Sequence, residues 1–120
     1  MVKNDPSDPG VNGSATPLPG VALARIQRLE ALYNEWAELL PGLQLAQQQW
    51  QQARERLQVL RQYYFEGEWR SDFAADEAGR IPDGVRRGIL TEDTLYNAFI
   101  AERELALTWV QLGAAALKDV

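Results

Sequence analysis

The sequence predicts an all-α protein, either an antiparallel helical hairpin or a three-helix, coiled-coil-like domain with a long ordered connection. Two stretches of apolar residues at steps of three and four predict two long helices. Between them lies an aromatic and acidic segment that follows neither step. We therefore expect residues 21–120 to form one helical domain, with helices over about 21–65 and 91–117 and a connection over 66–90.

Residues 1–20 differ in composition from the rest of the chain. They are rich in proline, glycine, serine, asparagine and aspartate, and this mixture buries too little apolar surface to offset the entropy lost on ordering. The expectation is a disordered leader, and a short docking peptide is the alternative.

The first helix is predicted from one apolar stripe. Its members are Ile26, Leu29, Tyr33, Trp36, Leu40 and Leu43, and the stripe resumes as Ala46, Trp50, Ala53, Leu57, Leu60 and Tyr64. Pro41 lacks a backbone donor and crowds the carbonyl four residues earlier, so the helix is either kinked or broken near residue 41. The near-continuous stripe and the lack of a good N-cap residue before Pro41 favour a kink. Such a stripe can also pair with a second copy, so a homodimer is an open alternative.

The last helix is predicted from a start signal. Thr91 is suited to accept hydrogen bonds from free backbone donors as the N-cap residue, and Glu92 and Asp93 place negative charge in the first turn. Leu90 and Leu95 then have the spacing of a hydrophobic staple.

The connection carries the residues most suited to binding. The candidate interaction surface comprises Tyr63, Tyr64, Trp69, Asp72, Asp76, Arg86 and Arg87. Aromatic anchors dominate binding energies at many interfaces, so Tyr63 and Trp69 are candidate hot spots. The alternative is structural: aromatic residues prefer burial and can staple the connection down, while Asp72 and Asp76 can brace turns and pair with arginines.

The composition limits which catalytic groups and metal ligands the chain can supply. The chain has no cysteine, which excludes disulfides and thiolate metal sites, and no histidine, which removes the commonest general base and zinc ligand. The segment from Asp72 lacks the alternating ligands and the turn glycine of an EF-hand loop. We expect no catalytic residue, no metal and no cofactor, with an irregular Mg²⁺ or Ca²⁺ site among the connection's carboxylates as the alternative.

An enzyme hypothesis comes from Glu35 and Glu38. They have the Glu-x-x-Glu spacing with which all-helical nucleotide pyrophosphohydrolases gather Mg²⁺. No Glu-x-x-Asp partner follows at a suitable distance, and both residues also fit a solvated helix face. An Mg²⁺-dependent nucleotide hydrolase is therefore kept only as an alternative function.

The net charge of −5 argues against direct nucleic-acid binding, which needs a basic face. No apolar run approaches the roughly 20 residues that span a bilayer, and the lack of cysteine fits a reducing compartment. We expect a cytoplasmic, non-enzymatic protein-interaction module, an adaptor, subunit or regulator whose protein partner is unknown. An acidic inhibitor or nucleic-acid mimic is the other alternative, although arginines interspersed among the acids count against it.

Four short motifs in fixed order resemble a known family. They are the pair Tyr63-Tyr64, Trp69-x-x-Asp72, Asp76-Glu77-x-Gly79, and Gly88-x-Leu90-Thr91-Glu92-Asp93 followed by Leu95-Tyr96. Together they resemble a family of small bacterial helical proteins classed only as a domain of unknown function, over roughly residues 25–110. Thr91 stands where the family pattern has serine, which preserves the capping chemistry, whereas Pro41 and Gly42 depart from the pattern of the first helix. The resemblance implies an all-helical fold and no activity.

Overall fold

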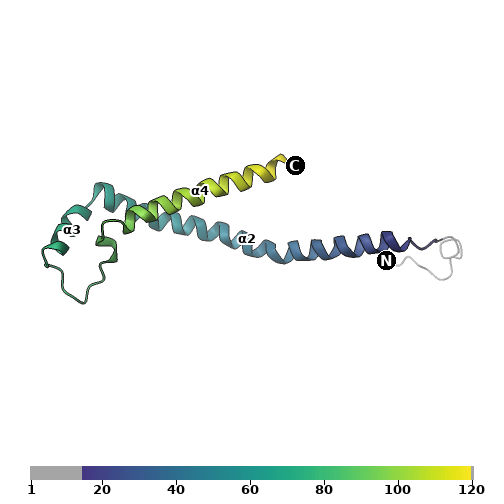
Figure 1. The fold of residues 1–120 in the computed structure, drawn as a ribbon, viewed down its shortest axis with the longest axis horizontal. Helices are drawn as coiled ribbons and strands as arrows, with labels where there is room; N and C mark the ends of the chain where they lie inside the picture. The colour runs from purple at the N-terminus through teal and green to yellow at the C-terminus, as the bar shows by residue number, and fades with distance from the viewer. Residues whose placement is uncertain (1–14, 120) are drawn as a thin grey trace. The chain divides into compact units, whose positions relative to one another are not determined.

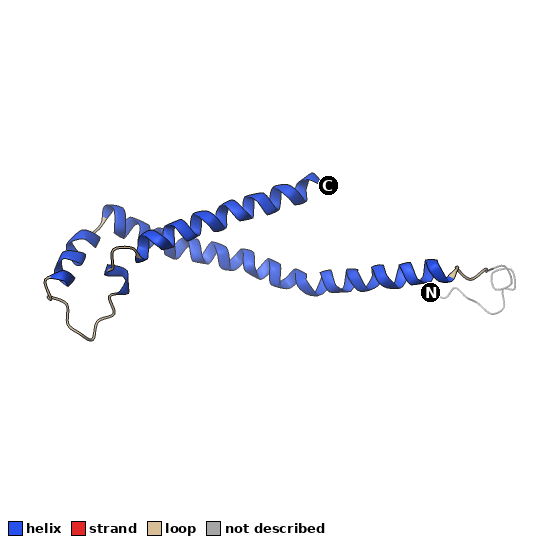
Figure 2. Cartoon of the chain, in the orientation of Figure 1, coloured by secondary structure: helices blue, strands red, loops and turns tan. Residues whose placement is uncertain are grey.

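The computed structural model describes residues 15–119, and all regular secondary structure in this range is helical (Figure 2). Its elements are α2 (Gly20–Glu66), α3 (Trp69–Glu77), the 3₁₀ helix η1 (Gly88–Leu90) and α4 (Thr94–Lys118). The predicted all-α class is confirmed, in its three-helix form. The chain divides after Ala46 into an N-terminal unit and a C-terminal unit.

Helix α2 is continuous from Gly20 to Glu66, and Pro41 lies inside it. The alternative of two helices that meet near Pro41 is therefore wrong. Proline removes one helical hydrogen bond, but its fixed φ angle is compatible with a helix. The glutamine, arginine, leucine and alanine residues that follow are strong helix formers, and they continue the helix beyond the missing bond.

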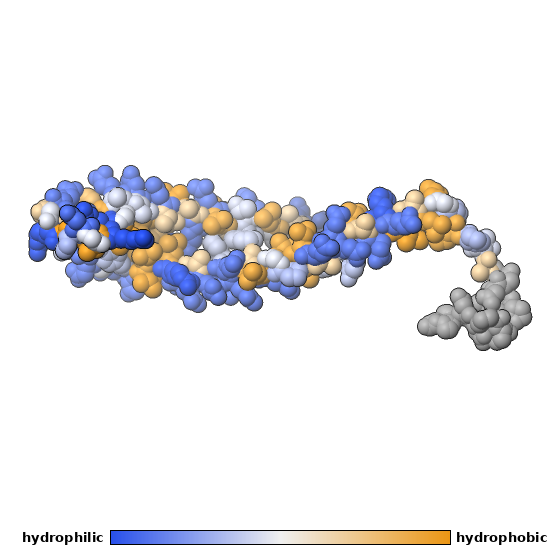
Figure 3. Space-filling view, turned by 90° about the horizontal axis from the view of Figure 1, so that it is seen from below, coloured by the Kyte–Doolittle hydropathy of each residue, from blue (hydrophilic) through white to orange (hydrophobic). Residues whose placement is uncertain are grey.

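In the N-terminal unit, residues 15–19 have no regular structure and α2 follows from Gly20. Most of the predicted leader, residues 1–14, lies outside the described residues. The apolar stripe is largely at the surface, with Tyr33 61% and Trp36 52% exposed. Figure 3 shows apolar side chains, in orange, at the surface among hydrophilic ones. One helix cannot bury its own stripe, so this unit has almost no core of its own.

In the C-terminal unit, α4 runs back beside the second half of α2 (Figure 1). The rings of Trp50 and Trp109 lie 6.2 Å apart and those of Tyr64 and Phe99 lie 5.6 Å apart. Residue numbers rise along one helix as they fall along the other, so the pairing is antiparallel. The buried core is small and sits at the junction of η1 and α4, where the buried residues are Leu90, Leu95 and Phe99.

Helix α4 begins at Thr94, three residues later than predicted. Asp93 occupies the N-cap position and makes no side-chain capping bond, so Thr91 is not the N-cap residue. Thr91 instead has an extended backbone after η1, and its hydroxyl contacts the Gly88 carbonyl and the Thr94 hydroxyl. The local capping signal is overridden because η1 buries Leu90 in the core before the helix starts.

The later start of α4 also changes the prediction of a hydrophobic staple between Leu90 and Leu95. With the N-cap at Asp93, Leu90 and Leu95 no longer occupy the staple positions that flank an N-cap. They are 7% and 2% exposed and form the centre of the core instead. Glu92 and Asp93 are exposed beside the start of α4, and neither lies within its first turn.

The predicted connection contains a helix of its own, α3, which ends in a Schellman motif. The N–H of Gly79 donates to the Asp76 carbonyl at 3.0 Å and the N–H of Arg80 to the Ala75 carbonyl at 2.9 Å. Gly79 has a φ of 72°, a left-handed conformation that favours glycine. The sharp end of α3 redirects the chain toward η1.

Candidate functional site

An aromatic cluster lies where α2 ends and α3 begins. The ring of Tyr64 lies at its centre, 4.8 Å from the ring of Trp69, 5.0 Å from Phe65 and 5.6 Å from Phe99. Trp69 in turn stacks on Phe73 at 5.0 Å. Aromatic pairs at these separations contribute stabilisation beyond the area that they bury, so the cluster holds three helices together.

Two hydrogen bonds fix α3 beside its neighbours. The hydroxyl of Tyr63 donates to Asp72 Oδ2 at 2.6 Å, and Trp69 Nε1 donates to the Ile89 carbonyl at 2.8 Å. Burial of the Tyr63 hydroxyl, together with its hydrogen bond to Asp72, raises the pKa of Tyr63 to about 12. The phenol therefore stays protonated and keeps its donor role at neutral pH.

The side chain of Arg87 links the segment between α3 and η1 to the end of α3. Its Nε atom lies 3.2 Å from Asp76 Oδ1, and its Nη1 donates to the Ile81 carbonyl at 3.1 Å. This ion pair is partly buried, with the Asp76 side chain 25% exposed. Arg86 is exposed, and no hydrogen bond or ion pair of its side chain is seen within residues 15–119.

A second charged group joins α2 to α4. Glu102 accepts a hydrogen bond from Arg61 Nη2 at 2.9 Å and lies 3.9 Å from Arg54 Nε. The Arg61 guanidinium also lies over the Phe99 ring, 4.6 Å from its centre. Arg61 thus combines an ion pair with a cation–π contact at the edge of the core.

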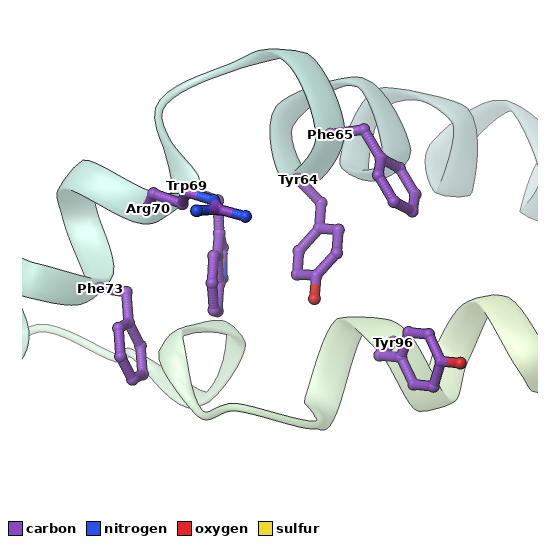
Figure 4. Close-up of a pocket in the computed structure, with 6 residues that line it drawn as sticks. All are labelled: Tyr64, Phe65, Trp69, Arg70, Phe73 and Tyr96. Atoms are coloured by element: carbon purple, nitrogen blue, oxygen red, sulfur yellow. The ribbon is translucent and has the colours of Figure 1, made fainter.

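The aromatic cluster borders an open cleft of about 470 Å³. Its lining residues are Tyr64 and Phe65 from α2, Trp69, Arg70 and Phe73 from α3, and Tyr96 from α4 (Figure 4). Phe65 is 62% and Tyr96 is 52% exposed, so aromatic surface reaches solvent here. A concave, largely aromatic surface with a cationic group is suited to binding an apolar side chain that carries or adjoins an anion.

The structure divides the predicted site residues into groups. Tyr64 and Trp69 line the cleft, whereas Tyr63, Asp72, Asp76 and Arg87 act as braces beside it, and Arg86 is exposed without a partner in the described range. The predicted interaction surface did not include four of the lining residues, which are Phe65, Arg70, Phe73 and Tyr96. The first three lie within the same aromatic segment of the sequence, so the density of aromatic residues in that segment could have pointed to them. Tyr96 belongs to the motif at the start of the last helix, and nothing in that motif indicates a binding role for it.

The described residues contain no group of three or more carboxylates placed to hold a metal ion. Asp72 and Asp76 each have a partner from the connection or its flanks, Tyr63 and Arg87 respectively. None of the described helices has the length and apolar character needed to cross a membrane.

The fold and the site define a class: a small all-helical protein whose helices meet at an aromatic junction bordered by an open cleft. The chain belongs to the family described as Domain of unknown function (DUF4298), whose model matches residues 26–112. The resemblance inferred from the four motifs is thereby confirmed. Neither the curated proteins nor the solved structures contain a match to the chain.

Proposed function

We propose that the chain is a non-enzymatic protein-interaction module that binds an amphipathic segment of a partner protein in the aromatic cleft. One observation carries the proposal: aromatic side chains that a stable core would bury, Phe65 and Tyr96, remain more than half exposed beside an open cleft. Exposed aromatic residues in a concave surface are the usual anchors of protein recognition. As part of this proposal the module acts in the cytoplasm, since a chain without cysteine suits a reducing compartment.

The braces support the proposal because they hold the cleft in shape before a partner arrives. Tyr63 holds α3 through Asp72, and Trp69 is fixed in orientation by the Ile89 carbonyl. A preformed site loses less conformational entropy on binding than a flexible one. The bracing residues are therefore expected to affect affinity indirectly, through the position of the aromatic rings.

Charge indicates the chemistry of the partner. Arg70 lines the cleft, and Arg103 lines an adjoining groove of about 270 Å³ that shares Phe65 and Tyr96 with it. Neither arginine is paired with a carboxylate within the described range. We infer a partner segment with an aliphatic or aromatic anchor and a neighbouring acidic residue, since a partner carboxylate can pair with either guanidinium.

The test is a quantitative pull-down from native lysate, treated with nuclease, using the wild type, Tyr96→Ser and Val59→Ser. Both substitutions remove an exposed apolar side chain, but Val59 is 69% exposed on α2 and does not line the cleft. Circular dichroism first establishes that each variant is folded. A partner retained by wild type and Val59→Ser but lost by Tyr96→Ser supports the proposal.

A synthetic peptide is then made from the binding segment of the captured partner. The affinity of this peptide is measured for wild type and for Arg70→Glu. We expect reversal of the Arg70 charge to weaken a peptide with an acidic residue about tenfold or more, the effect of one lost charged contact. Retention of every partner by Tyr96→Ser would contradict the proposal. Capture of a basic nucleic-acid-binding protein that Tyr96→Ser retains would favour the acidic mimic, and enrichment of a nucleotide instead of protein would favour the hydrolase.

A further inference from the structure

The N-terminal unit has a surface that the proposed cleft does not use. Its helix carries a stripe composed of Ile26, Leu29, Tyr33, Trp36, Leu40 and Leu43. All except Leu40 are exposed, between 47% and 61%. The rings of Tyr33 and Trp36 lie 6.4 Å apart, so the two largest members share one face of the helix. In the described part of this unit, α2 is the sole regular element and no second helix of the unit covers the stripe.

The order of residues in the stripe is nearly the same in both directions. The steps between members are three, four, three, four and three, with two aliphatic residues at each end and two aromatic residues in the middle. A helix with such a stripe is complementary to an antiparallel copy of itself. A two-fold axis between Tyr33 and Trp36 places aliphatic residues opposite aliphatic residues and aromatic residues opposite aromatic residues. Ile26 then lies opposite Leu43 of the second copy, and Leu29 lies opposite Leu40 of the second copy.

The residues that flank the stripe distinguish antiparallel from parallel pairing. In heptad terms Leu32 and Leu39 occupy g positions when Ile26 is an a position. Antiparallel helices bring g positions together, so Leu32 meets Leu39 of the second copy. Parallel helices would instead place Leu39 against Gln44 of the second copy, an e position. The two leucines are 52% and 63% exposed, and antiparallel pairing covers both with apolar surface.

Charge favours the same orientation. The first half of the segment carries Arg25, Arg28 and Glu30, and the second half carries Glu35 and Glu38. The first half is thus net positive and the second net negative. Antiparallel pairing places opposite charges near one another, whereas parallel pairing places like charges together. The opposed helix dipoles add to this preference.

We propose that residues 22–43 form an antiparallel homodimer with the same residues of a second copy. The dimer buries the exposed stripe and places the Tyr33 and Trp36 rings of both copies at its two-fold axis. Such a dimer presents two aromatic clefts, one on each chain, so the dimer itself would be bivalent for a partner that binds the cleft. The dimer itself does not depend on the function proposed for the cleft.

The first test measures the mass of the full chain by sedimentation equilibrium, with Trp36→Lys and Asn34→Lys as the matched variants. Asn34 lies on the opposite side of the helix, is exposed, and receives the same charge. We expect a dimer for wild type and Asn34→Lys and a monomer for Trp36→Lys. A monomeric wild type at every concentration, or a dimer unaffected by Trp36→Lys, would overturn the proposal.

The second test establishes the orientation and does not require Trp36→Lys to stay helical. The chain has no cysteine, so Leu29→Cys and Leu40→Cys each introduce a single thiol. On oxidation, the antiparallel register predicts disulfide-linked dimers when the two variants are mixed and none from either variant alone. Self-linkage of each variant would show parallel pairing, and no linkage in the mixture would exclude this interface; both results overturn the proposal.

A third variant separates this inference from the proposed function. Tyr96→Ser changes the cleft and leaves the stripe intact, so it is expected to sediment as the wild type does. Loss of the dimer in Tyr96→Ser would place the self-association in the C-terminal unit and contradict the proposed register.

Discussion

The hydroxyl of Tyr63 donates a hydrogen bond of 2.6 Å to Asp72 Oδ2 and thereby joins the last turns of α2 to α3. The acceptor is a carboxylate, so this bond is stronger than one between neutral groups. The bond also exists only while the phenol is protonated. The attachment of α3 is therefore sensitive to alkaline pH.

This pairing predicts a loss of stability at alkaline pH. The pKa of Tyr63 rises from the ordinary value of 10.0 to about 12 on folding, so folding favours the protonated phenol. Its contribution to the free energy of unfolding is complete below pH 10 and disappears as the pH rises to about 12. Urea unfolding across this range is expected to show a smaller decline for Tyr63→Phe than for wild type. Tyr96→Phe, which leaves the pair intact, serves as control, and equal declines for wild type and Tyr63→Phe would contradict the assignment.

Glu102 is predicted to stabilise the pairing of α2 with α4. Its side chain is 16% exposed and faces Arg61 and Arg54. Glu102→Gln removes the charge but keeps the shape, and we expect the free energy of unfolding to fall by about 1 kcal/mol. Glu104→Gln is the control, since Glu104 is exposed and its carboxylate has no ion pair within residues 15–119. Denaturant unfolding that does not distinguish the two variants would show that the ion pair contributes nothing.

Gly79 is predicted to be intolerant of a side chain. Its φ of 72° is unfavourable for any residue with a Cβ atom, although the space around it is open. Gly79→Ala is expected to destabilise the protein by about 1 kcal/mol, through strain in the Schellman motif alone. Gly84→Ala, at an open site without a positive φ, is expected to be neutral or slightly stabilising. Similar thermal unfolding curves for both variants would refute the role of the left-handed turn.

Trp69 is predicted to anchor η1 through its indole N–H. Trp69→Phe keeps an aromatic ring in the cluster but leaves the Ile89 carbonyl without its partner, at an expected cost of about 1 kcal/mol. The readout is amide exchange at Leu90, whose N–H donates to the Arg87 carbonyl at 2.9 Å. Exchange there should accelerate in Trp69→Phe and remain unchanged in Trp109→Phe. An unchanged rate at Leu90 in both variants would show that the indole bond does not hold η1.

The helices could be predicted from sequence because their evidence is local. The stripe from Ile26 to Tyr64 has helical spacing throughout, and Pro41 does not change that spacing enough to break the helix. The start of α4 could not be predicted correctly, because burial of Leu90 in η1 outweighs the capping preference of Thr91. A cap contributes about 1 kcal/mol, less than the burial of a leucine side chain.

The site could be predicted only in part. Tyr64 and Trp69 line the cleft, but the neighbouring Tyr63 faces Asp72. Adjacent residues on a helix point about 100° apart, so one member of a pair can border a cleft while the other acts as a brace. Tyr96 joins the cleft from α4, thirty residues beyond Glu66 at the end of α2, and only the fold brings it there.

The sequence by itself determined the family, the all-helical class and the positions of the long helices, because apolar periodicity and motif order are properties of the chain alone. Only the tertiary structure decided that Arg61 meets Glu102 across 41 residues and that Trp69 binds the Ile89 carbonyl. Such pairs depend on how each helix is rotated about its axis and on where the turns redirect the chain. Local sequence preferences do not specify those rotations, which are set by the packing of Leu90, Leu95 and Phe99 at the junction.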